Sequence, residues 1–380
     1  MKENRRDFIK KSASLAAALS IGGTSVSTAK IRDIVDQKTE ETIVQTAYAR
    51  DAGMQMCEAY FAGMEERKVA LTKQMDVLGA VAGINPKLMN ADAKPWEFEA
   101  IKSNVDAWKK VGLTLRVIEG PPSLAEKTKL GLEGRDEEIA NFITFMKNLS
   151  KAGIDTICYN WMPAIGWFRT SMDKPGRGGA LVTAFDYEDI KNAPNTKYGV
   201  VTKETLWKNL EYFLKAVVPE AEKAGIKLAM HPDDPQVDSL KGISRIMTTV
   251  PNFDRLLKIY PSPNNGITMC QGNFSLMGVD IPKTVHHFGK EKIHFVHFRN
   301  VRGGKFKFEE TFHDEGQIDM YKAIEAYYDI GFKGPLRPDH VPTMAGDSNS
   351  FPGYSTIGTL YALGYIRGLM DAVTRNKTRS

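Results

Sequence analysis

Cysteine is scarce in this sequence: three residues among 380 cannot form the disulfide framework of a small secreted domain. With 42% hydrophobic and 26% charged residues, the composition is that of a soluble globular protein, not of a disordered, collagenous or multi-span membrane chain. No G-x-G-x-x-G pattern opens a helix after the first predicted strand, so nucleotide binding gains no support.

A large excess of charge of one sign is also missing. The formal net charge is +5, but residues 1–29 hold five basic and two acidic side chains, and the remaining residues have a net charge of +2. This near-neutral balance gives no electrostatic footprint for nucleic acid or for an anionic membrane. We therefore expect a small-molecule partner, no nucleic acid, and no membrane association of the mature chain.

The N-terminus has the three parts of a twin-arginine export signal in their usual order. Arg5 and Arg6 precede a weakly apolar stretch, Ala13–Gly23, and small residues lead to a candidate cleavage site after Ala29. The apolar stretch is too short to span a bilayer as a helix, which takes about 20 residues. We predict that residues 1–29 are a signal peptide and that the mature protein is periplasmic. The alternative is a basic tail that does not act as an export signal.

Short apolar runs recur along the rest of the chain, and several lack polar alternation, which is typical of buried parallel strands. Seven clear runs and a weaker eighth predict strands at Leu78–Ile84, Leu113–Ile118, Thr156–Tyr159, Lys227–Met230, Gly266–Met269, Ile293–Phe298, Gly334–Arg337 and, more weakly, Met54–Phe61. Helical patterns lie between most of them, at Pro95–Val111, Asp136–Ala152, Lys203–Ala224 and Met320–Ile330. The last three helices end at a glycine, which suits a helix C-cap.

Eight strands with intervening helices favour a single-domain α/β fold, the (β/α)8 TIM barrel, over residues 48–375. Residues 30–47 are polar and form a lead-in segment. The alternative is an open doubly wound sheet, which the missing glycine fingerprint and the positions of the ionisable residues make less favourable.

Four late strands end in side chains that bind metals: His231, Cys270, His297 and Asp339. In a barrel the carboxyl ends of the strands converge on one face, so these four side chains are expected to share a pocket. Two imidazoles, a thiolate and a carboxylate suit a divalent transition metal such as manganese, iron, cobalt or zinc. Calcium and magnesium prefer sites made of oxygen ligands alone and fit less well.

Each of these residues also has a structural interpretation when taken alone. A histidine at a strand end is most often a hydrogen-bonded structural residue, a lone cysteine a small buried hydrophobe, and an aspartate after Arg-Pro a turn residue. Their recurrence at one position in four strands favours the metal site. The other cysteines and three further histidines are expected to be core, packing or surface residues: Cys57, Cys158, His286, His287 and His294.

Several ordered strings resemble the mannonate dehydratase family, xylose-isomerase-like TIM barrels that dehydrate D-mannonate. The resemblance is strongest between Gly131 and Ala372. The matching strings are Gly134-Arg135-Asp136, Cys158 to Pro163, Trp167 to Thr170, His231 to Pro235, Val296 to Asn300, His313 to Met320, Arg337 to His340, and Pro352 to Tyr354.

The resemblance implies the same four metal ligands, with manganese or iron as the ion. It implies that His340 and Tyr354 carry the acid–base chemistry, in roles that the sequence does not assign. Further polar groups are implied on the substrate side: Arg299, Asn160, Arg169 and His313. Of these, Arg299 is expected to act in catalysis by binding a carboxylate through two hydrogen bonds.

Several positions depart from the family pattern, and the first-strand region lacks the aromatic pattern usual in the family. After the third strand the family has Glu-Ser-x-Pro-Val-His, whereas this chain has Glu119 followed by Gly120-Pro-Pro-Ser-Leu. Gly166 stands where the family has aspartate before its Trp-x-Arg-Thr string, and Val341 stands where it has glycine. The predicted metal centre is thus complete, while parts of the sugar-contacting wall differ.

The resemblance implies a metal-dependent hydro-lyase that converts D-mannonate to 2-keto-3-deoxygluconate, a step of glucuronate catabolism. The alternative is a metal-dependent sugar isomerase or epimerase on the same barrel. A hydrolase or a binding protein that kept the metal as a structural element is a further option. A nuclease would need a basic groove, which the charge balance does not support. Oligomeric state stays open, and barrels of this kind often form homo-oligomers.

Overall fold

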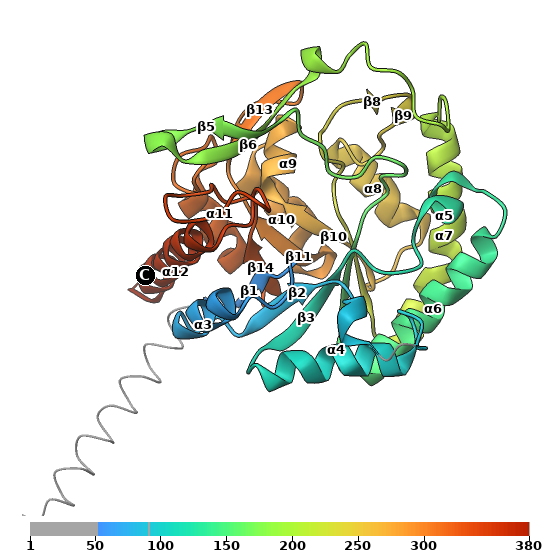
Figure 1. The fold of residues 1–380 in the computed structure, drawn as a ribbon, viewed down its shortest axis with the longest axis horizontal. Coiled ribbons are helices and arrows are strands. Elements are labelled where there is room, and N and C mark those ends of the chain that lie inside the picture. The colour runs from blue at the N-terminus through green and yellow to red at the C-terminus, as the bar shows by residue number, and fades with distance from the viewer. Residues whose placement is uncertain (1–51, 90–91, 380) are drawn as a thin grey trace, which may run out of the picture. The chain divides into compact units, whose positions relative to one another are not determined.

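The computed structural model describes residues 52–89 and 92–379, and a closed barrel of eight parallel strands forms its centre (Figure 1). Around the barrel the strands follow the order β1-β14-β11-β10-β7-β4-β3-β2, so each strand pairs with its neighbour along the chain. Their bounds are β1 (Gln55–Ala59), β2 (Gly79–Ala82), β3 (Thr114–Glu119), β4 (Thr156–Tyr159), β7 (Lys227–Met230), β10 (Asn265–Cys270), β11 (Ile293–Phe298) and β14 (Pro335–Pro338). The predicted (β/α)8 fold is confirmed, and each predicted apolar run overlaps one of these strands to within one or two residues at most ends.

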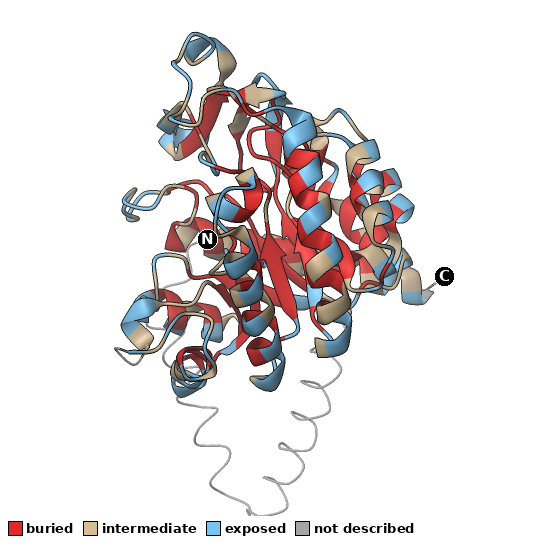
Figure 2. Cartoon of the chain, turned by 90° about the vertical axis from the view of Figure 1, so that its right-hand side faces the viewer, coloured by how far each residue is buried: buried red, intermediate tan, exposed pale blue. Residues whose placement is uncertain are grey.

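A helix follows each barrel strand and lies outside the ring. These helices are α3 (Glu66–Gln74), α4 (Phe98–Lys110), α6 (Arg135–Lys151), α7 (Lys203–Ala224), α8 (Val250–Ile259), α10 (Ile281–Lys292), α11 (Met320–Asp329) and α12 (Thr356–Arg379). Shorter pieces are α5 (Glu126–Leu130), α9 (Gln271–Leu276), η1 (Pro86–Leu88), η2 (Arg177–Gly179) and η3 (Tyr187–Asp189). Figure 2 shows the buried faces of the helices turned toward the strands.

Local signals in the sequence explain the bounds of the helices. In α7, the Thr202 side chain accepts a hydrogen bond from the backbone N–H of Thr205, which caps the first turn. The same helix ends at Gly225, whose φ of 68° is the left-handed conformation that glycine adopts without strain. Gly153 and Gly331 have similar φ angles, of 80° and 69°, before β4 and β14. The predicted glycine stops therefore lead directly into strands.

The interior of the barrel is packed and is not a pore. Six side chains from six strands fill it: Cys57, Val81, Val117, Cys158, Ala229 and Phe295. The larger core lies between the strands and the surrounding helices. Both Cys57 and Cys158 are buried free thiols, as expected from the sequence.

A second sheet lies outside the barrel and was not predicted. Its antiparallel strands follow the order β12-β13-β6-β5 and come from two long loops, those after β4 and β11. The bounds are β5 (Ser171–Pro175), β6 (Leu181–Asp186), β12 (Val301–Gly304) and β13 (Lys307–Glu310). A small hairpin of β8 (Ser239–Leu240) and β9 (Ile243–Ser244) follows β7. The sheet fixes both loops, and β13 carries Glu310 toward the carboxyl ends of the barrel strands.

The predicted signal peptide, residues 1–29, and the polar lead-in, residues 30–47, lie outside the described residues. Among the residues that the structure describes, no helix is both long enough and apolar enough to span a membrane.

Candidate metal and catalytic centre

The structure brings the four predicted metal ligands together at the carboxyl ends of their strands. Nε2 of His231 lies 3.2 Å from Nδ1 of His297. Oδ2 of Asp339 lies 3.7 Å from Sγ of Cys270 and 3.8 Å from Nδ1 of His297. Ligands that bind one transition metal at about 2.0–2.3 Å are separated from each other by roughly 3 to 4 Å. His231, Cys270 and His297 therefore have the spacing of a single-ion site, and Asp339 adjoins two of these three ligands.

The protonation of the two imidazoles also suits a cation. Nδ1 of His231 lies 2.7 Å from the carbonyl of Pro232, which only accepts, so this nitrogen carries the proton and Nε2 keeps its lone pair. Burial lowers the pKa of His231, which keeps the ring neutral. Arg337 donates to Nδ1 of His297 at 3.3 Å, so that nitrogen carries no proton. The two ring nitrogens that face each other are therefore both unprotonated, and Arg337 would release the His297 lone pair to a bound ion.

The two carboxylate oxygens of Asp339 have different surroundings: one accepts hydrogen bonds from the protein, and the other faces the predicted metal ligands. Its Oδ1 accepts hydrogen bonds from Arg337 at 2.7 Å and from the Tyr354 hydroxyl at 3.2 Å, while Oδ2 faces Cys270 and His297. Burial opposes ionisation of Asp339, but the positive charges of His340 and Arg337 hold its pKa well below the usual range. A carboxylate held in this way keeps one oxygen available to a metal.

Glu119 joins the centre from the end of β3, although it was not among the predicted site residues. Arg337 donates to its two carboxylate oxygens at 3.0 and 3.2 Å, and Nε2 of His297 lies 3.4 Å away. Burial opposes its ionisation, but the charges of Arg337 and His297 lower its pKa to about 2. Glu119, Cys158 and His297 form a second group with ligand-like spacing. Because Arg337 already neutralises Glu119, we assign this group to holding His297 in place.

His340 and Tyr354 lie side by side, with ring centroids 5.5 Å apart. Nδ1 of His340 is 3.1 Å from Oε1 of Glu310. Burial opposes the ionisation of Glu310, but Arg299 and His340 are the main positive charges that lower its pKa to about 2. The ionised carboxylate only accepts, so Nδ1 carries a proton and Nε2 is the ring atom left to exchange a proton with a ligand.

Two structural features hold these side chains in place. His340 has a φ of 45°, a conformation that non-glycine residues adopt rarely and at a cost of about 1–3 kcal/mol. The Glu310 contact and the ring of Trp167, with centroids 5.4 Å apart, fix its imidazole. Burial and the charge of Asp339 raise the pKa of Tyr354 well above its usual range, so its hydroxyl stays protonated.

Arg299 and Arg169 form a buried ion network behind the metal ligands. Arg299 donates to Glu310 at 2.5 and 2.8 Å and to Asp234 at 3.0 Å, and it lies 3.6 Å from Sγ of Cys270. Arg169 donates to the same two acids, at 2.5 and 3.0 Å to Asp234 and at 2.6 Å to Glu310. Neither arginine lines the cavity described below. The structure therefore places both guanidiniums where they hold acids in position, and the substrate contacts expected from the sequence stay a prediction.

Asn160 does face the cavity, and its amide has a defined orientation. Its Oδ1 accepts from Nζ of Lys129 at 3.0 Å and from the backbone N–H of Met162 at 3.1 Å. Both partners donate, so the oxygen is used by the protein and the amide N–H groups remain for a ligand. Burial lowers the pKa of Lys129 to about 8. Lys129 was not recognised in the sequence, where nothing distinguishes it from a surface lysine.

His313 lies apart from the catalytic pair. It is buried against Phe298, and its Nε2–H donates to the Phe298 carbonyl at 2.7 Å. Burial lowers its pKa to about 4, so the ring is neutral and a poor acid at neutral pH. The structure therefore gives no support to the expected substrate-side role of His313. The remaining histidines behave as expected: His294 contacts backbone carbonyls, and His286 and His287 are exposed.

A cavity of about 140 Å³ opens onto this centre. It is smaller than pockets for drug-sized ligands, which enclose roughly 300–1,000 Å³, and suits one small molecule. Side chains of both predicted roles line it, namely His231, His297, Asp339, His340, Tyr354 and Asn160. Trp167 forms part of its wall.

Known proteins share both the sequence and the fold. The family model of D-mannonate dehydratase (UxuA) matches residues 54–197 and 192–380. Mannonate dehydratase 2 of Halalkalibacterium halodurans is 35% identical over 351 residues, which cover 84% of this chain and 100% of the relative. The crystal structure of mannonate dehydratase from Streptococcus suis serotype 2 has a TM-score of 0.77 at 32% identity, covering 86% of this chain and 95% of that one.

The chain belongs to the mannonate dehydratase family. The resemblance found in its motifs is thereby confirmed, and the members named above are hydro-lyases. A D-tagatose 3-epimerase-like protein has a TM-score of 0.54 at 13% identity, and a xylose isomerase domain protein from Planctomyces limnophilus has 0.52 at 11%. These distant neighbours show the shared barrel fold alone.

The departures from the family pattern leave open space around the site. An added Cβ at Gly120, where the family has serine, would meet no atom within 4 Å, and the same holds at Gly166, where it has aspartate. Gly120 lines the cavity, so the missing side chain widens its wall. Val341 pairs through its backbone N–H with the carbonyl of Gly353 at 2.8 Å and has no left-handed φ, so glycine is not required there.

Proposed function

We propose that the protein dehydrates a sugar acid, D-mannonate, to 2-keto-3-deoxygluconate with a divalent manganese or iron ion held by His231, Cys270, His297 and Asp339. The observation that carries the proposal is the placement of His231, His297 and Asp339 in one cavity with His340 and Tyr354, with Cys270 buried directly behind them. Membership of the mannonate dehydratase family supports the choice of substrate.

Dehydration removes the proton on the carbon next to the carboxylate and expels the hydroxyl from the following carbon. The bound ion would supply Lewis-acid stabilisation for the negative charge that develops on substrate oxygens. The reaction also needs a general base for the proton and a general acid for the departing hydroxyl. The protein must therefore place a base with a free lone pair near the α-carbon and a protonated acid near the hydroxyl of the next carbon.

His340 and Tyr354 meet this need. Glu310 holds the proton on Nδ1 of His340, which leaves Nε2 as the base that takes the α-proton. Tyr354 keeps its phenolic proton and is the donor to the leaving hydroxyl. Their rings are 5.5 Å apart between centroids, a separation suited to groups that act on neighbouring carbons. The amide N–H groups of Asn160 would bind a substrate hydroxyl or carboxylate oxygen.

Export by the twin-arginine route remains part of the proposal, since it rests on the N-terminal residues alone. The alternative of an isomerase or epimerase gains nothing from the comparisons, because the epimerase-like neighbours are too distant in sequence to indicate more than the fold.

The test is turnover by the full chain reconstituted with manganese. We expect D-mannonate to yield a 2-keto-3-deoxy acid, with one metal bound per chain. Cys270→Ala should lose both the metal and the turnover, whereas Cys57→Ala, which removes a buried thiol from the barrel interior, should keep both. An unchanged metal content in Cys270→Ala would contradict the ligand assignment. A product that is an isomer of the substrate would contradict the dehydratase assignment.

A further inference from the structure

A second and larger cavity lies at the opposite end of the barrel, where the strands begin. It encloses about 640 Å³, compared with about 140 Å³ at the candidate catalytic centre. Residues just before or within the first three positions of β1, β3, β4, β7, β10, β11 and β14 line it. The six apolar side chains that fill the barrel separate the two cavities. Nothing in the proposed dehydration uses this end of the protein.

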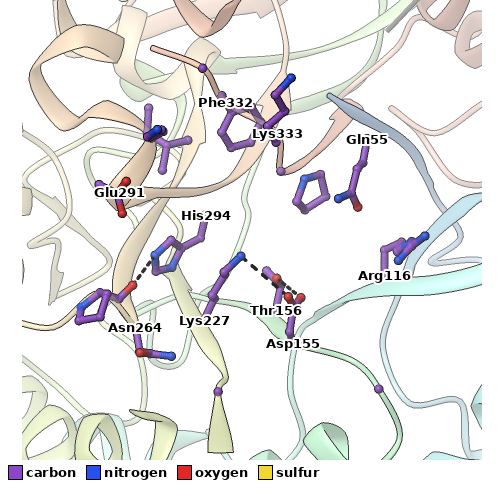
Figure 3. A pocket seen from close by; sticks show the side chains of 18 of the residues that line it. Gln55, Arg116, Asp155, Thr156, Lys227, Asn264, Glu291, His294, Phe332 and Lys333 are labelled. Carbon is purple, nitrogen blue, oxygen red and sulfur yellow. Dashed lines mark hydrogen bonds and ion pairs between the residues drawn. The ribbon is translucent and has the colours of Figure 1, made fainter. Parts of the chain in front are cut away.

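The lining is polar and has an excess of positive charge. Four basic side chains and two acidic ones take part: Arg116, Lys227, Lys290, Lys333, Asp155 and Glu291. Figure 3 shows Lys227 between the two sides of the cavity, joined to Asp155 by an ion pair of 3.8 Å. Among the described residues, neither Arg116 nor Lys290 has a carboxylate within 4.0 Å. Their charges are therefore available to a ligand.

Arg116 reaches the cavity because of an irregularity in β3. The register between β2 and β3 shifts so that Ala80 pairs with Leu115 and Val81 with Val117, which leaves Arg116 without a partner. A bulge of this kind redirects a side chain, and bulges occur often beside functional sites. A regular strand would not present this arginine at the same place.

The glycines that end the preceding helices keep the entrance open. Gly153 and Gly225 line the cavity, and an added Cβ at either would meet no atom within 4 Å. The remaining polar side chains suit hydroxyl groups: Gln55 and Asn264 lie on opposite sides of the cavity in Figure 3. His294 is not available, because its ring nitrogens lie 2.9 and 3.0 Å from two backbone carbonyls.

We propose that this cavity is a second ligand site that binds a phosphorylated monosaccharide. The arginine and the three lysines of the lining supply the positive charge that a phosphate group needs, and a guanidinium can bind a phosphate through two hydrogen bonds. The amides and the two carboxylates supply donors and acceptors for sugar hydroxyls. The volume lies within the roughly 300–1,000 Å³ range of small-molecule pockets. Along β7, Lys227 is four residues from His231, about 13 Å apart, so the ligand would not contact the metal ligands.

The experiment is calorimetric titration of the manganese-loaded full chain with glucose 6-phosphate, inorganic phosphate and glucose. We expect one glucose 6-phosphate per chain, bound at least 10-fold more tightly than either inorganic phosphate or glucose. Saturating D-mannonate should leave this affinity unchanged, because the two cavities are separate. No binding of glucose 6-phosphate up to 10 mM, or competition with D-mannonate, would overturn the proposal, as would equal affinity for inorganic phosphate.

Charge-matched variants assign the binding to the cavity. The Arg116→Gln/Lys290→Gln double variant should weaken binding at least 10-fold, with dehydratase turnover unchanged. The control Lys109→Gln/Lys283→Gln removes the same charge from exposed helix positions outside the cavity and should stay within about twofold of wild type. If the double variant proves unstable, the two single substitutions replace it. If the control weakened glucose 6-phosphate binding equally, the loss would come from net charge alone and the proposed site would be wrong.

Discussion

Replacing Tyr354 with phenylalanine tests the proposed proton donor with little disturbance of the fold. The substitution removes one oxygen and keeps the ring, which packs against Phe61 and His340 at centroid distances of 5.1 and 5.5 Å. Only the hydrogen bond to Oδ1 of Asp339, 3.2 Å long, is lost. That oxygen keeps its 2.7 Å bond to Arg337 and is not left unsatisfied.

The structure separates the expected cost in stability from the cost in rate. A hydrogen bond of this kind contributes about 0.5–1.5 kcal/mol, so the free energy of unfolding should fall by roughly 1 kcal/mol. A general acid contributes about 10²–10⁴-fold to the rate, or roughly 3 to 5 kcal/mol of activation free energy. We therefore expect Tyr354→Phe to lose at least 100-fold in kcat while it binds one manganese ion and remains folded.

The assay combines three measurements: formation of 2-keto-3-deoxygluconate, metal content, and thermal unfolding. Tyr60→Phe is the matched control, because the buried Tyr60 hydroxyl makes one hydrogen bond of 2.6 Å, to Thr72, and the ring packs against Trp108 away from the cavity. The control should keep its kcat. If Tyr354→Phe retains kcat within threefold of wild type, the proton comes from another group and the assignment is wrong.

Three further perturbations follow from the same contacts. Lys129→Met should raise the KM for D-mannonate more than it lowers kcat, because the amide of Asn160 loses its 3.0 Å hydrogen-bond partner. In the wild type, the low folded-state pKa of Lys129, about 8, should make the free energy of unfolding rise between pH 8 and 10.5, and the variant should lack this rise. Glu310→Gln should lower kcat at least 10-fold by releasing the Nδ1 proton of His340, and should destabilise the fold by about 3–5 kcal/mol, measured by denaturant unfolding, because two buried guanidiniums lose a carboxylate. Removing the ion with a chelator should leave the circular dichroism spectrum unchanged and lower the Tm, since an ion at 100 times its Kd stabilises the fold by about 2.7 kcal/mol; collapse of the secondary structure would contradict a preformed site.

The barrel could be predicted from the sequence because the patterns that mark its strands and helix ends are local. Each buried strand is a short apolar run, and glycines in the left-handed conformation mark where three helices stop before strands. The four ligands were found by the rule that strand ends converge, together with the family resemblance. The same rule applied to Glu119, at the end of β3, would have included it as well.

The second sheet, and the contacts that its residues make in the site, could not be predicted from local sequence patterns. Strand β5 is largely exposed and polar, so its sequence has no strand pattern. Among the described residues it pairs only with β6 of the same loop, and β6 in turn pairs with β13 of the loop after β11. Glu310 lies on this sheet, so its contact with His340 had no local signal. Arg299 and Arg169 were recognised as site residues. Their hydrogen-bond partners, Asp234 and Glu310, come from distant parts of the chain and could not be inferred from the local sequence.

The charges around the ligand group explain why the protein needs these buried arginines. Four carboxylates and three guanidiniums contact one another there: Glu119, Asp234, Glu310, Asp339, Arg169, Arg299 and Arg337. With the acids ionised, the group has a net charge of −1, and a Cys270 thiolate makes it −2. A bound divalent ion would bring the centre to neutrality, so the proposed anionic substrate would meet no excess of negative charge. Without the arginines the same ligands would bind the ion more tightly but would repel the substrate carboxylate.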